Sequence, residues 1–254
     1  MSAIAVLSLK GGVGKSTTVL GLAGAAWMRG MRALVIDLDP QANATVALDP
    51  PPFAFTVGDV LADGRPGIAR EAIVPTGWGP QVDLLPSEEA VAHRNRPEGK
   101  DSATRLRVCL TGAIDGYDLI LIDCPPSLDE LTRNGLAAAD SALVVTEPGF
   151  FALQGATRAL RAVEAARTSV NLRLRPAGVL VNRVRGNLSE HRFRVDELRE
   201  VYGDLVLDPV IPERSAVQQA QGAGVPVQAW RSPGASEVSD AYDDILDRLL
   251  SDVP

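Results

Sequence analysis

Short apolar segments alternate with longer amphipathic segments along most of the chain. The apolar segments contain few polar residues, which is typical of strands whose two faces are both buried. We expect strands at residues 3–9, 32–39, 82–87, 118–126, 141–148, 177–184 and 208–212. We expect helices at residues 15–30, 102–115, 128–138, 151–169, 188–202, 214–222 and 237–251. This alternation predicts a doubly wound α/β fold, in which helices cover both faces of a mostly parallel sheet.

Residues 49–80 interrupt this alternation. They are rich in proline and glycine, as in "DPPPFAF" and "PTGWG", and these residues favour turns and loops. Neither an internal repeat nor a long linker accompanies the interruption. We therefore interpret the segment as a surface excursion and predict a single domain over residues 1–254.

Composition and charge narrow the class of protein. Of the 254 residues, 46% are hydrophobic, so the chain can bury a sizeable core. The net charge of −7 argues against a strongly basic nucleic-acid binder, although it leaves room for a local basic patch. Cys109 and Cys124 form no CxxC pair, which argues against a disulfide scaffold and against a zinc or iron–sulfur site. No segment reaches the ~18 apolar residues of a membrane span and no signal peptide follows Met1, so we expect a cytoplasmic protein.

The segment "LSLKGGVGKST", residues 7–17, connects the first expected strand to the first expected helix. Its glycines permit positive φ angles and a close approach of the backbone to a ligand. They are Gly11, Gly12 and Gly14. In this context the loop N–H groups and the start of the helix are suited to binding phosphate.

Two side chains complete this phosphate loop. Lys15 is placed to reach the β- and γ-phosphates of a nucleotide, and Ser16 is placed to give its hydroxyl to Mg²⁺. The common pattern GxxxxGK[ST] would need a glycine where the chain has Leu9, so the pattern that fits is the variant KGGxGK[ST]. This variant contains a second lysine, Lys10, and the chain has only three lysines in all.

These segments resemble the ParA/MinD family of ATPases. "KGGVGKST" resembles the deviant Walker A motif of that family, and "LILIDCPPS" at residues 119–127 resembles its Walker B segment. The resemblance continues in "VIDLDPQANAT" at residues 35–45, "LVNRV" at residues 180–184 and "VIPERSAVQQAQGAGVP" at residues 210–226. The triplet DPQ favours the ParA branch over the nitrogenase-iron-protein and metal-insertion branches. The resemblance implies a P-loop NTPase fold of the deviant Walker A class.

The resemblance also implies a slow ATPase that uses Mg²⁺ and closes into a sandwich dimer over two ATP molecules. The implied nucleotide-binding residues are Lys10, Gly11, Gly12, Val13, Gly14, Lys15, Ser16, Thr17, Asn182 and Pro212. Lys15 would serve its own nucleotide, Lys10 would reach the partner subunit's phosphates, and Asn182 would read the adenine. A charge that arrives only on dimerisation would make hydrolysis conditional on the dimer. The alternative is that Lys10 is an ordinary solvated lysine.

Three carboxylates follow two of the expected strands. Asp37 and Asp39 share one face because they are two residues apart, and open α/β sheets bind ligands at the carboxyl ends of their strands. By resemblance, Asp39 orients or deprotonates the attacking water, and Asp37 and Asp123 support a hard Mg²⁺ ion. The implied catalytic set is Lys10, Lys15 and Asp39, and the implied metal-binding set is Ser16, Asp37 and Asp123. The alternative is that these aspartates only cap helices.

The resemblance further implies non-specific DNA binding by basic residues late in the chain. The candidates are Arg183, Arg185, Arg192, Arg194 and Arg214. Phosphate contacts of this kind carry no sequence information and weaken with salt. Acidic residues are interspersed among the arginines, and the chain has Ala216 and Val225 where the family commonly has arginine and lysine. The alternative is a solvated amphipathic helix without DNA.

The implied partners are a second copy of the chain, DNA and a ParB-like or cargo-adaptor protein whose basic N-terminal segment stimulates hydrolysis. The ATP state would then be nucleoid-associated. Two other functions remain open: a MinD-like, membrane-associated cell-division ATPase, and a nucleotide-dependent scaffold in which hydrolysis is incidental. The last expected helix is acidic and an anionic membrane would repel it, so we expect no membrane partner.

Overall fold

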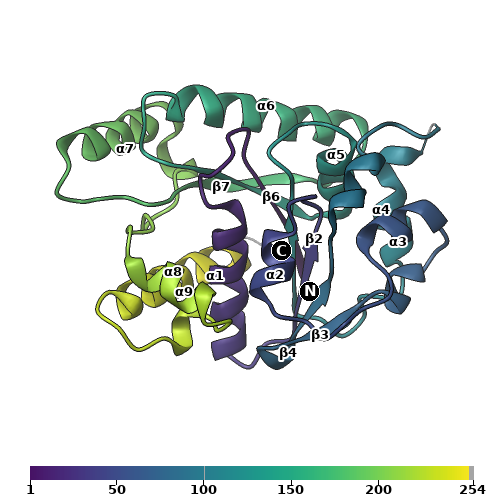
Figure 1. Ribbon diagram of the computed structural model, residues 1–254. Coiled ribbons are helices and arrows are strands. Elements are labelled where there is room, and N and C mark those ends of the chain that lie inside the picture. Colours follow the sequence, from purple (N-terminus) through teal and green to yellow (C-terminus); the bar gives the residue numbers. More distant parts are fainter. Residues whose placement is uncertain (100, 252–254) are drawn as a thin grey trace.

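The computed structural model describes residues 1–99 and 101–251 (Figure 1). Within these residues seven strands form one sheet in the order β3-β4-β2-β5-β1-β6-β7. The strands are β1 (Ser2–Leu7), β2 (Ala33–Asp37), β3 (Val74–Thr76), β4 (Gly79–Leu85), β5 (Leu119–Asp123), β6 (Ser141–Thr146) and β7 (Arg175–Val181). Neighbouring strands are parallel except for the antiparallel pair β3 and β4. The predicted doubly wound, mostly parallel α/β fold is confirmed.

Helices cover both faces of this sheet (Figure 1). They are α1 (Lys15–Met28), α2 (Asn43–Ala47), α3 (Val57–Asp63), α4 (Arg105–Leu110), α5 (Glu130–Ala138), α6 (Ala152–Ser169), α7 (Ser189–Tyr202), α8 (Ser215–Gly222) and α9 (Ala235–Ser251). Successive side chains of a strand point to opposite faces, so each strand supplies two cores. In β1, Ala5 and Leu7 pack in the core with α3 to α7, whereas Ile4 and Val6 pack in the core with α1, α2, α8 and α9.

The acidic last helix, α9, packs its apolar face against α1. Its buried residues include Tyr242 and Ile245, which lie in the same core as Leu22 of α1. Gly21 of α1 leaves room for this contact, because a Cβ at that position would lie 2.3 Å from the Tyr242 ring. The apolar face of α9 is therefore part of the protein core.

Residues 49–80 contain more regular structure than the proline and glycine content predicts. They include α3, which begins at Thr56 with a capping box that Asp59 completes. They also include β3, whose Pro75 lies on an edge strand, where a missing backbone N–H is tolerated. The interpretation of this segment as an irregular excursion is therefore wrong for α3, β3 and the start of β4.

Two other expectations also need correction. Residues 208–212 do not form a strand of the sheet, because only an isolated bridge joins Pro212 to Val184. The helix expected at residues 102–115 is shorter, since regular α-helix ends at Leu110. Short 3-10 helices account for other turns: η1 (Ile68–Glu71), η2 (Glu89–Arg94), η3 (Ser102–Thr104), η4 (Gly203–Leu205) and η5 (Val227–Ala229).

The order of the strands brings the candidate site residues together at the carboxyl ends of the central strands. β1 lies between β5 and β6, and the glycine-rich loop leaves its carboxyl end to enter α1. β2 lies on the far side of β5, so Asp37 at the end of β2 is the direct neighbour of Asp123 at the end of β5. The loop and the carboxylates thus meet where doubly wound folds bind ligands. None of the helices in residues 1–99 and 101–251 combines the length and apolarity needed to cross a membrane.

Candidate functional site

The glycine-rich loop has the backbone of a phosphate-binding nest. Gly12 has φ 82° and Gly14 has φ 91°, values that other residues rarely adopt. Gly14 is also confined by packing, because a Cβ there would lie 2.1 Å from Asn182 Nδ2. α1 begins at Lys15, directly after Gly14, so its unpaired N–H groups face the loop.

Asn182 directly follows β7, and its side chain is hydrogen-bonded to the glycine-rich loop. Its Nδ2 donates to Val13 O at 3.0 Å, and its Oδ1 accepts from Arg183 N at 2.9 Å. The side chain is 2% exposed. Both functions of the amide are therefore engaged within the protein, and its predicted contact with adenine stays a prediction.

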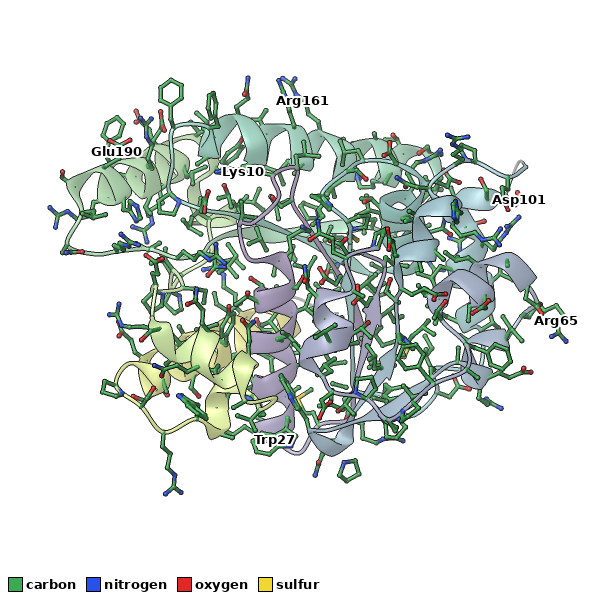
Figure 2. The ribbon with its side chains drawn as sticks, viewed as in Figure 1. Lys10, Trp27, Arg65, Asp101, Arg161 and Glu190 are labelled. Carbon is green, nitrogen blue, oxygen red and sulfur yellow. The ribbon has the colours of Figure 1, made fainter. Side chains whose placement is uncertain are left out.

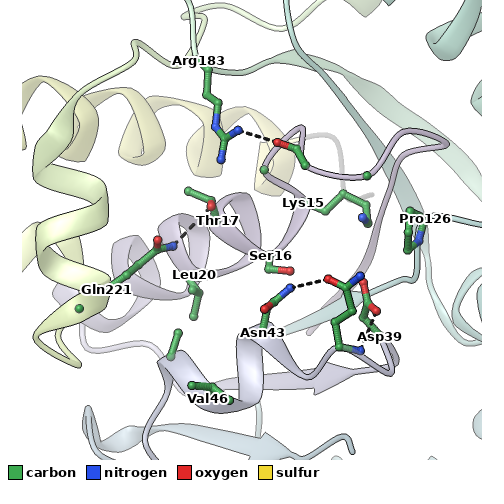
Figure 3. A pocket seen from close by; sticks show the side chains of 16 residues that line it. Lys15, Ser16, Thr17, Leu20, Asp39, Asn43, Val46, Pro126, Arg183 and Gln221 are labelled. Carbon is green, nitrogen blue, oxygen red and sulfur yellow. Dashed lines mark hydrogen bonds between the residues drawn. The ribbon is translucent and has the colours of Figure 1, made fainter. Parts of the chain in front are cut away.

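A cavity of about 690 Å³ opens above the loop. Its size falls within the range of small-molecule sites. At one end lie Lys15, Ser16 and Asp39, and at the other lie Gln221 of α8 and Thr17 (Figure 3). The glycine-rich loop and Lys15 give one end of this cavity the groups that suit a phosphate-bearing ligand.

Asp39 faces the phosphate end of the cavity although it is only 4% exposed. One carboxylate oxygen accepts from Gln41 N at 3.0 Å, and Ser87 Oγ donates to Asp39 O at 2.9 Å. These bonds fix the turn after β2. Asp39 is thus held in a position from which a carboxylate can orient water at the end of a phosphate chain.

Asp37 has a different environment, since its oxygens accept three hydrogen bonds from the turn that follows it. The donors are Asp39 N at 3.0 Å, Thr45 N at 2.9 Å and Thr45 Oγ1 at 2.8 Å. Burial raises the pKa of Asp37 to about 6 despite these bonds. Asp37 therefore positions the segment carrying Asp39, and its predicted part in the Mg²⁺ site stays a prediction.

Asp123 is fully buried, and neither of its carboxylate oxygens has a hydrogen-bond partner of ordinary geometry among the residues that the structure describes, although the nearby Ser16 hydroxyl partly offsets the rise of its pKa that burial causes. Burial, followed by the charge of Asp37, raises the pKa of Asp123 well above its ordinary value. An unpartnered buried carboxylate is costly and fits a site completed by a cation. Ser16 and Asp123 carry oxygen atoms of the kind that Mg²⁺ favours, and their predicted part in a Mg²⁺ site stays a prediction. Within the described ranges, no group of three or more His, Cys, Asp or Glu residues is arranged to hold a metal ion.

Lys10 and Lys15 differ sharply in exposure. Lys15 is 6% exposed and lines the cavity, whereas the Lys10 side chain is 61% exposed. Lys10 Nζ forms an ion pair with Glu147, which follows β6. Figure 2 shows Lys10 at the tip of the loop, on the side of the molecule where α6 and α7 lie. The geometry therefore separates one buried lysine at the cavity from one exposed lysine beside it.

The candidate DNA-binding arginines do not form an unpaired basic patch. Arg185 forms an ion pair with Glu213, and Arg214 forms two bonds with Glu237 at 2.7 and 2.8 Å. Arg192 donates to a backbone carbonyl at 3.1 Å.

Arg194 is covered as well as paired. Its side chain is 14% exposed and pairs with Glu190 at 2.7 Å and Glu197 at 3.1 Å. Its guanidinium also lies over the rings of Phe150 and Phe193. Exposed ion pairs contribute little to stability, so DNA phosphates can replace the carboxylates as partners of such arginines. The carboxylates nevertheless neutralise much of the positive charge that would attract DNA.

Pro212 and Arg183 each line a cavity, and their predicted contacts with nucleotide and with DNA stay predictions. Pro212 is absent from the lining of the main cavity among the described residues, and it borders a second cavity of about 390 Å³ with Arg214 and Glu237. Arg183 was assigned to DNA, yet it lines the main cavity and donates to Gly12 O at 2.6 Å (Figure 3).

Several functional residues were not identified from the sequence. Thr45 holds Asp37, Glu147 holds Lys10, and Gln221 lines the far end of the cavity. Only Thr45 had a signal, since it lies in the "DPQANAT" segment that supported the resemblance. The others depend on contacts between segments far apart in the chain.

Comparison with known proteins agrees with this geometry. The profile of a family described as an AAA domain matches residues 1–175. The chain is 37% identical over 256 residues to the chromosome partitioning protein ParA of Caulobacter vibrioides, covering 98% of this chain and 93% of that protein. It is 34% identical over 248 residues to the chromosome-partitioning ATPase Soj of Thermus thermophilus, covering 97% and 96%. A solved structure, the cobyrinic acid a,c-diamide synthase of Mycobacterium smegmatis with bound ADP and magnesium, matches with a TM-score of 0.80 and 30% identity over 98% of this chain and 94% of that one.

Proposed function

The chain belongs to the ParA/Soj family of partition ATPases, and from that premise we propose that it uses Mg·ATP to position a cargo. In this proposal ATP binding closes two subunits into a sandwich dimer, and the dimer binds DNA without sequence preference. A partner protein on the cargo, with a basic N-terminal segment, stimulates hydrolysis and releases the dimer. The protein would work in the cytoplasm and associate with the nucleoid in its ATP state.

The observation that carries the proposal is that a single phosphate loop contains one buried lysine and one exposed lysine. Lys15 lies at its own cavity, where it can neutralise the β- and γ-phosphates. Lys10 projects away from that cavity into solvent. A lysine in this position supports contact with a nucleotide on a facing subunit.

In the composite site each residue has a distinct part. Lys15 binds the phosphates of its own nucleotide, and Lys10 adds charge from the facing subunit where negative charge develops in the transition state. Asp39 orients the attacking water or accepts its proton. Ser16 and Asp123 would hold Mg²⁺, which supplies charge neutralisation to the phosphates when bound.

In this proposal the ATP-bound dimer binds to DNA and is released from it after hydrolysis. Arg185, Arg192, Arg194 and Arg214 remain the candidate contacts, although most of them are paired with carboxylates. Binding would therefore depend on exchanging weak internal ion pairs for phosphates. We expect it to be weak in one subunit and useful only when the dimer doubles the contacts.

A MinD-like membrane function is less well supported. Such a function needs an amphipathic helix with a free apolar face. The apolar face of α9 is buried in the protein core, and its Asp243 and Asp247 pair with Arg29, which directly follows α1, at 2.6 and 2.5 Å. Releasing α9 to a membrane would break both sets of contacts.

An amide-forming synthase, as named for the mycobacterial structure, is also less well supported. An enzyme that forms amides by way of a thiolate nucleophile needs an accessible, activated cysteine. Cys109 and Cys124 are both buried, and burial raises the pKa of each thiol. Neither cysteine suits that chemistry.

The test of the proposed function is binding to random-sequence duplex DNA with ATP, with ADP and without nucleotide, across a salt series. The proposal expects binding with ATP alone and a steep fall in affinity as salt rises. The variant that replaces Arg185 and Arg214 together by alanine should bind ATP normally and bind DNA less. ATP binding without DNA binding in any state would direct the search to a protein scaffold instead.

A further inference from the structure

Arg183 differs from the other late arginines because its side chain turns toward the phosphate loop. Its Nη1 donates to Gly12 O at 2.6 Å, and it lines the same cavity as Lys15 and Asp39 (Figure 3). Arg185, two residues later, is held instead by an ion pair. Among the described residues Arg183 forms no ion pair within 4.0 Å, although the pKa of Glu213 is lowered first by the hydrogen bond from Arg185 and also by the charge of Arg183.

The backbone at Arg183 is fixed in an unusual conformation. Its φ is 55°, in the left-handed region that residues with a side chain rarely adopt. Asn182 Oδ1 accepts from Arg183 N at 2.9 Å, and Val184 N donates to Ile211 O at 2.9 Å. Both neighbours are therefore anchored, and they hold the residue in this conformation. Such outliers persist where the surrounding structure imposes them, often at ligand sites.

The chemistry of the side chain suits a phosphate ligand. A guanidinium carries five N–H donors in a planar fork that matches phosphate oxygens, and the bond to Gly12 O uses one of them. Gly12 belongs to the loop whose N–H groups form the phosphate nest. The guanidinium therefore lies against the loop and lines the cavity, with donors left for a ligand there.

We propose that Arg183 is a nucleotide-binding residue that contacts the phosphates of the ATP or ADP held by its own subunit. The proposal rests on the proposed function, since it assumes an adenine nucleotide in the cavity. It moves Arg183 from the DNA surface to the nucleotide site. The hydrogen bond from Arg183 to Gly12 O also ties the loop to the segment after β7, in addition to the bond from Asn182.

The test is the affinity of the full chain for ADP in the presence of Mg²⁺, measured by titration calorimetry. ADP is chosen because it requires no facing subunit, so a loss of affinity assigns the contact within one subunit. The variants are Arg183→Ala, Arg183→Gly and Arg183→Lys, with Arg167→Ala, at an exposed arginine of α6, as the matched control. Arg183→Gly removes the guanidinium while accepting the positive φ, which separates the contact from backbone strain.

The expected result is that the Kd for ADP rises about 10- to 100-fold in Arg183→Ala and Arg183→Gly, as for the loss of a hydrogen-bonded charge. Arg183→Lys should lose less, and Arg167→Ala should match the wild type. The melting temperature of nucleotide-free Arg183→Gly should stay near that of the wild type. Unchanged ADP affinity in both Arg183→Ala and Arg183→Gly overturns the proposal, as does a loss that only parallels a lower melting temperature. A wild-type chain that binds no ADP would instead overturn the proposed function.

Discussion

Lys10 Nζ donates to a carboxylate oxygen of Glu147, across the gap between the phosphate loop and the segment that follows β6. The pair keeps the exposed lysine beside its own subunit. If Lys10 serves a facing nucleotide, it must first leave Glu147. The carboxylate then competes with the phosphates of the second subunit for one ammonium group.

Replacing Glu147 by glutamine should therefore favour the dimer. The change removes the negative charge and keeps a hydrogen-bond acceptor of similar shape. Because exposed ion pairs are weak, we expect dimerisation with ATP to tighten by only about two- to fivefold, measured by analytical ultracentrifugation. Glu164→Gln, which removes an exposed pair with Arg167 on α6, should have no effect. Weaker dimerisation in Glu147→Gln would show that the pair supports the competent loop.

Replacing Asp39 by alanine should block hydrolysis and leave ATP binding intact. Asp39 faces the phosphate end of the cavity, and loss of a positioned base costs about 100-fold or more in rate. The ATP dimer should then accumulate on DNA, measured by phosphate release together with DNA co-sedimentation. Asp115→Ala, at an exposed site, should behave as the wild type. Hydrolysis at the normal rate in Asp39→Ala would assign the water to another group.

Replacing Asp123 by asparagine should stabilise the nucleotide-free protein and weaken its response to Mg²⁺. The change removes a buried carboxylate that has no hydrogen-bond partner of ordinary geometry among the described residues, and we expect a gain of about 1–3 kcal/mol. For a chain of this size each kcal/mol corresponds to about 2–4 °C in melting temperature. Scanning calorimetry without nucleotide measures the gain, and ADP titration with and without Mg²⁺ measures the loss.

This gain should depend on pH in a defined direction. The pKa of Asp123 is raised by burial, so folding favours its protonated form. The contribution of that proton to stability is present at low pH and is lost as pH rises through the raised pKa. The advantage of Asp123→Asn should therefore be larger at pH 8 than at pH 5. An equal advantage at both values would contradict the assignment of the raised pKa.

Gly14 and Gly11 should respond differently to alanine. A Cβ at Gly14 meets Asn182 Nδ2 at 2.1 Å and φ is 91°, whereas a Cβ at Gly11 meets nothing within 4 Å. Gly14→Ala should lose nucleotide binding and melt at a lower temperature, since the left-handed conformation alone costs about 1–2 kcal/mol. Gly11→Ala should keep the melting temperature of the wild type. Equal melting temperatures for the two variants would contradict the close packing of the loop against β7.

Much of the fold was predictable because its strands are buried on both faces and therefore read as continuous apolar runs. β1, β2, β5 and β6 have this character, and so does the second half of β7, residues 178–181. β3 could not be predicted, because this short edge strand with Pro75 shows neither a run of apolar residues nor an alternation of apolar and polar residues. Residues 208–212 were apolar enough to predict a strand, but their backbone bonds join them to loops and to the end of β7 only.

The site was predictable where its parts adjoin in sequence and not where they meet through the fold. The loop from Lys10 to Thr17 is contiguous, so its pattern could be read directly. Glu147 and Arg183 reach the loop from the ends of other strands. The positive φ of Arg183 has no sequence signal, because such angles are expected at glycine and asparagine rather than arginine.

The central claim, that Lys10 acts on the nucleotide of a facing subunit, is tested most directly by mixing two inactive variants. Lys10→Ala lacks the exposed lysine and Asp39→Ala lacks the proposed base, so neither should hydrolyse ATP alone. In a mixed dimer one site combines an intact Asp39 with the partner's intact lysine, and hydrolysis should return to as much as about a quarter of the wild-type rate for random pairing. If Lys10 served its own nucleotide, every site in the mixture would lack one residue, and the mixture would stay inactive.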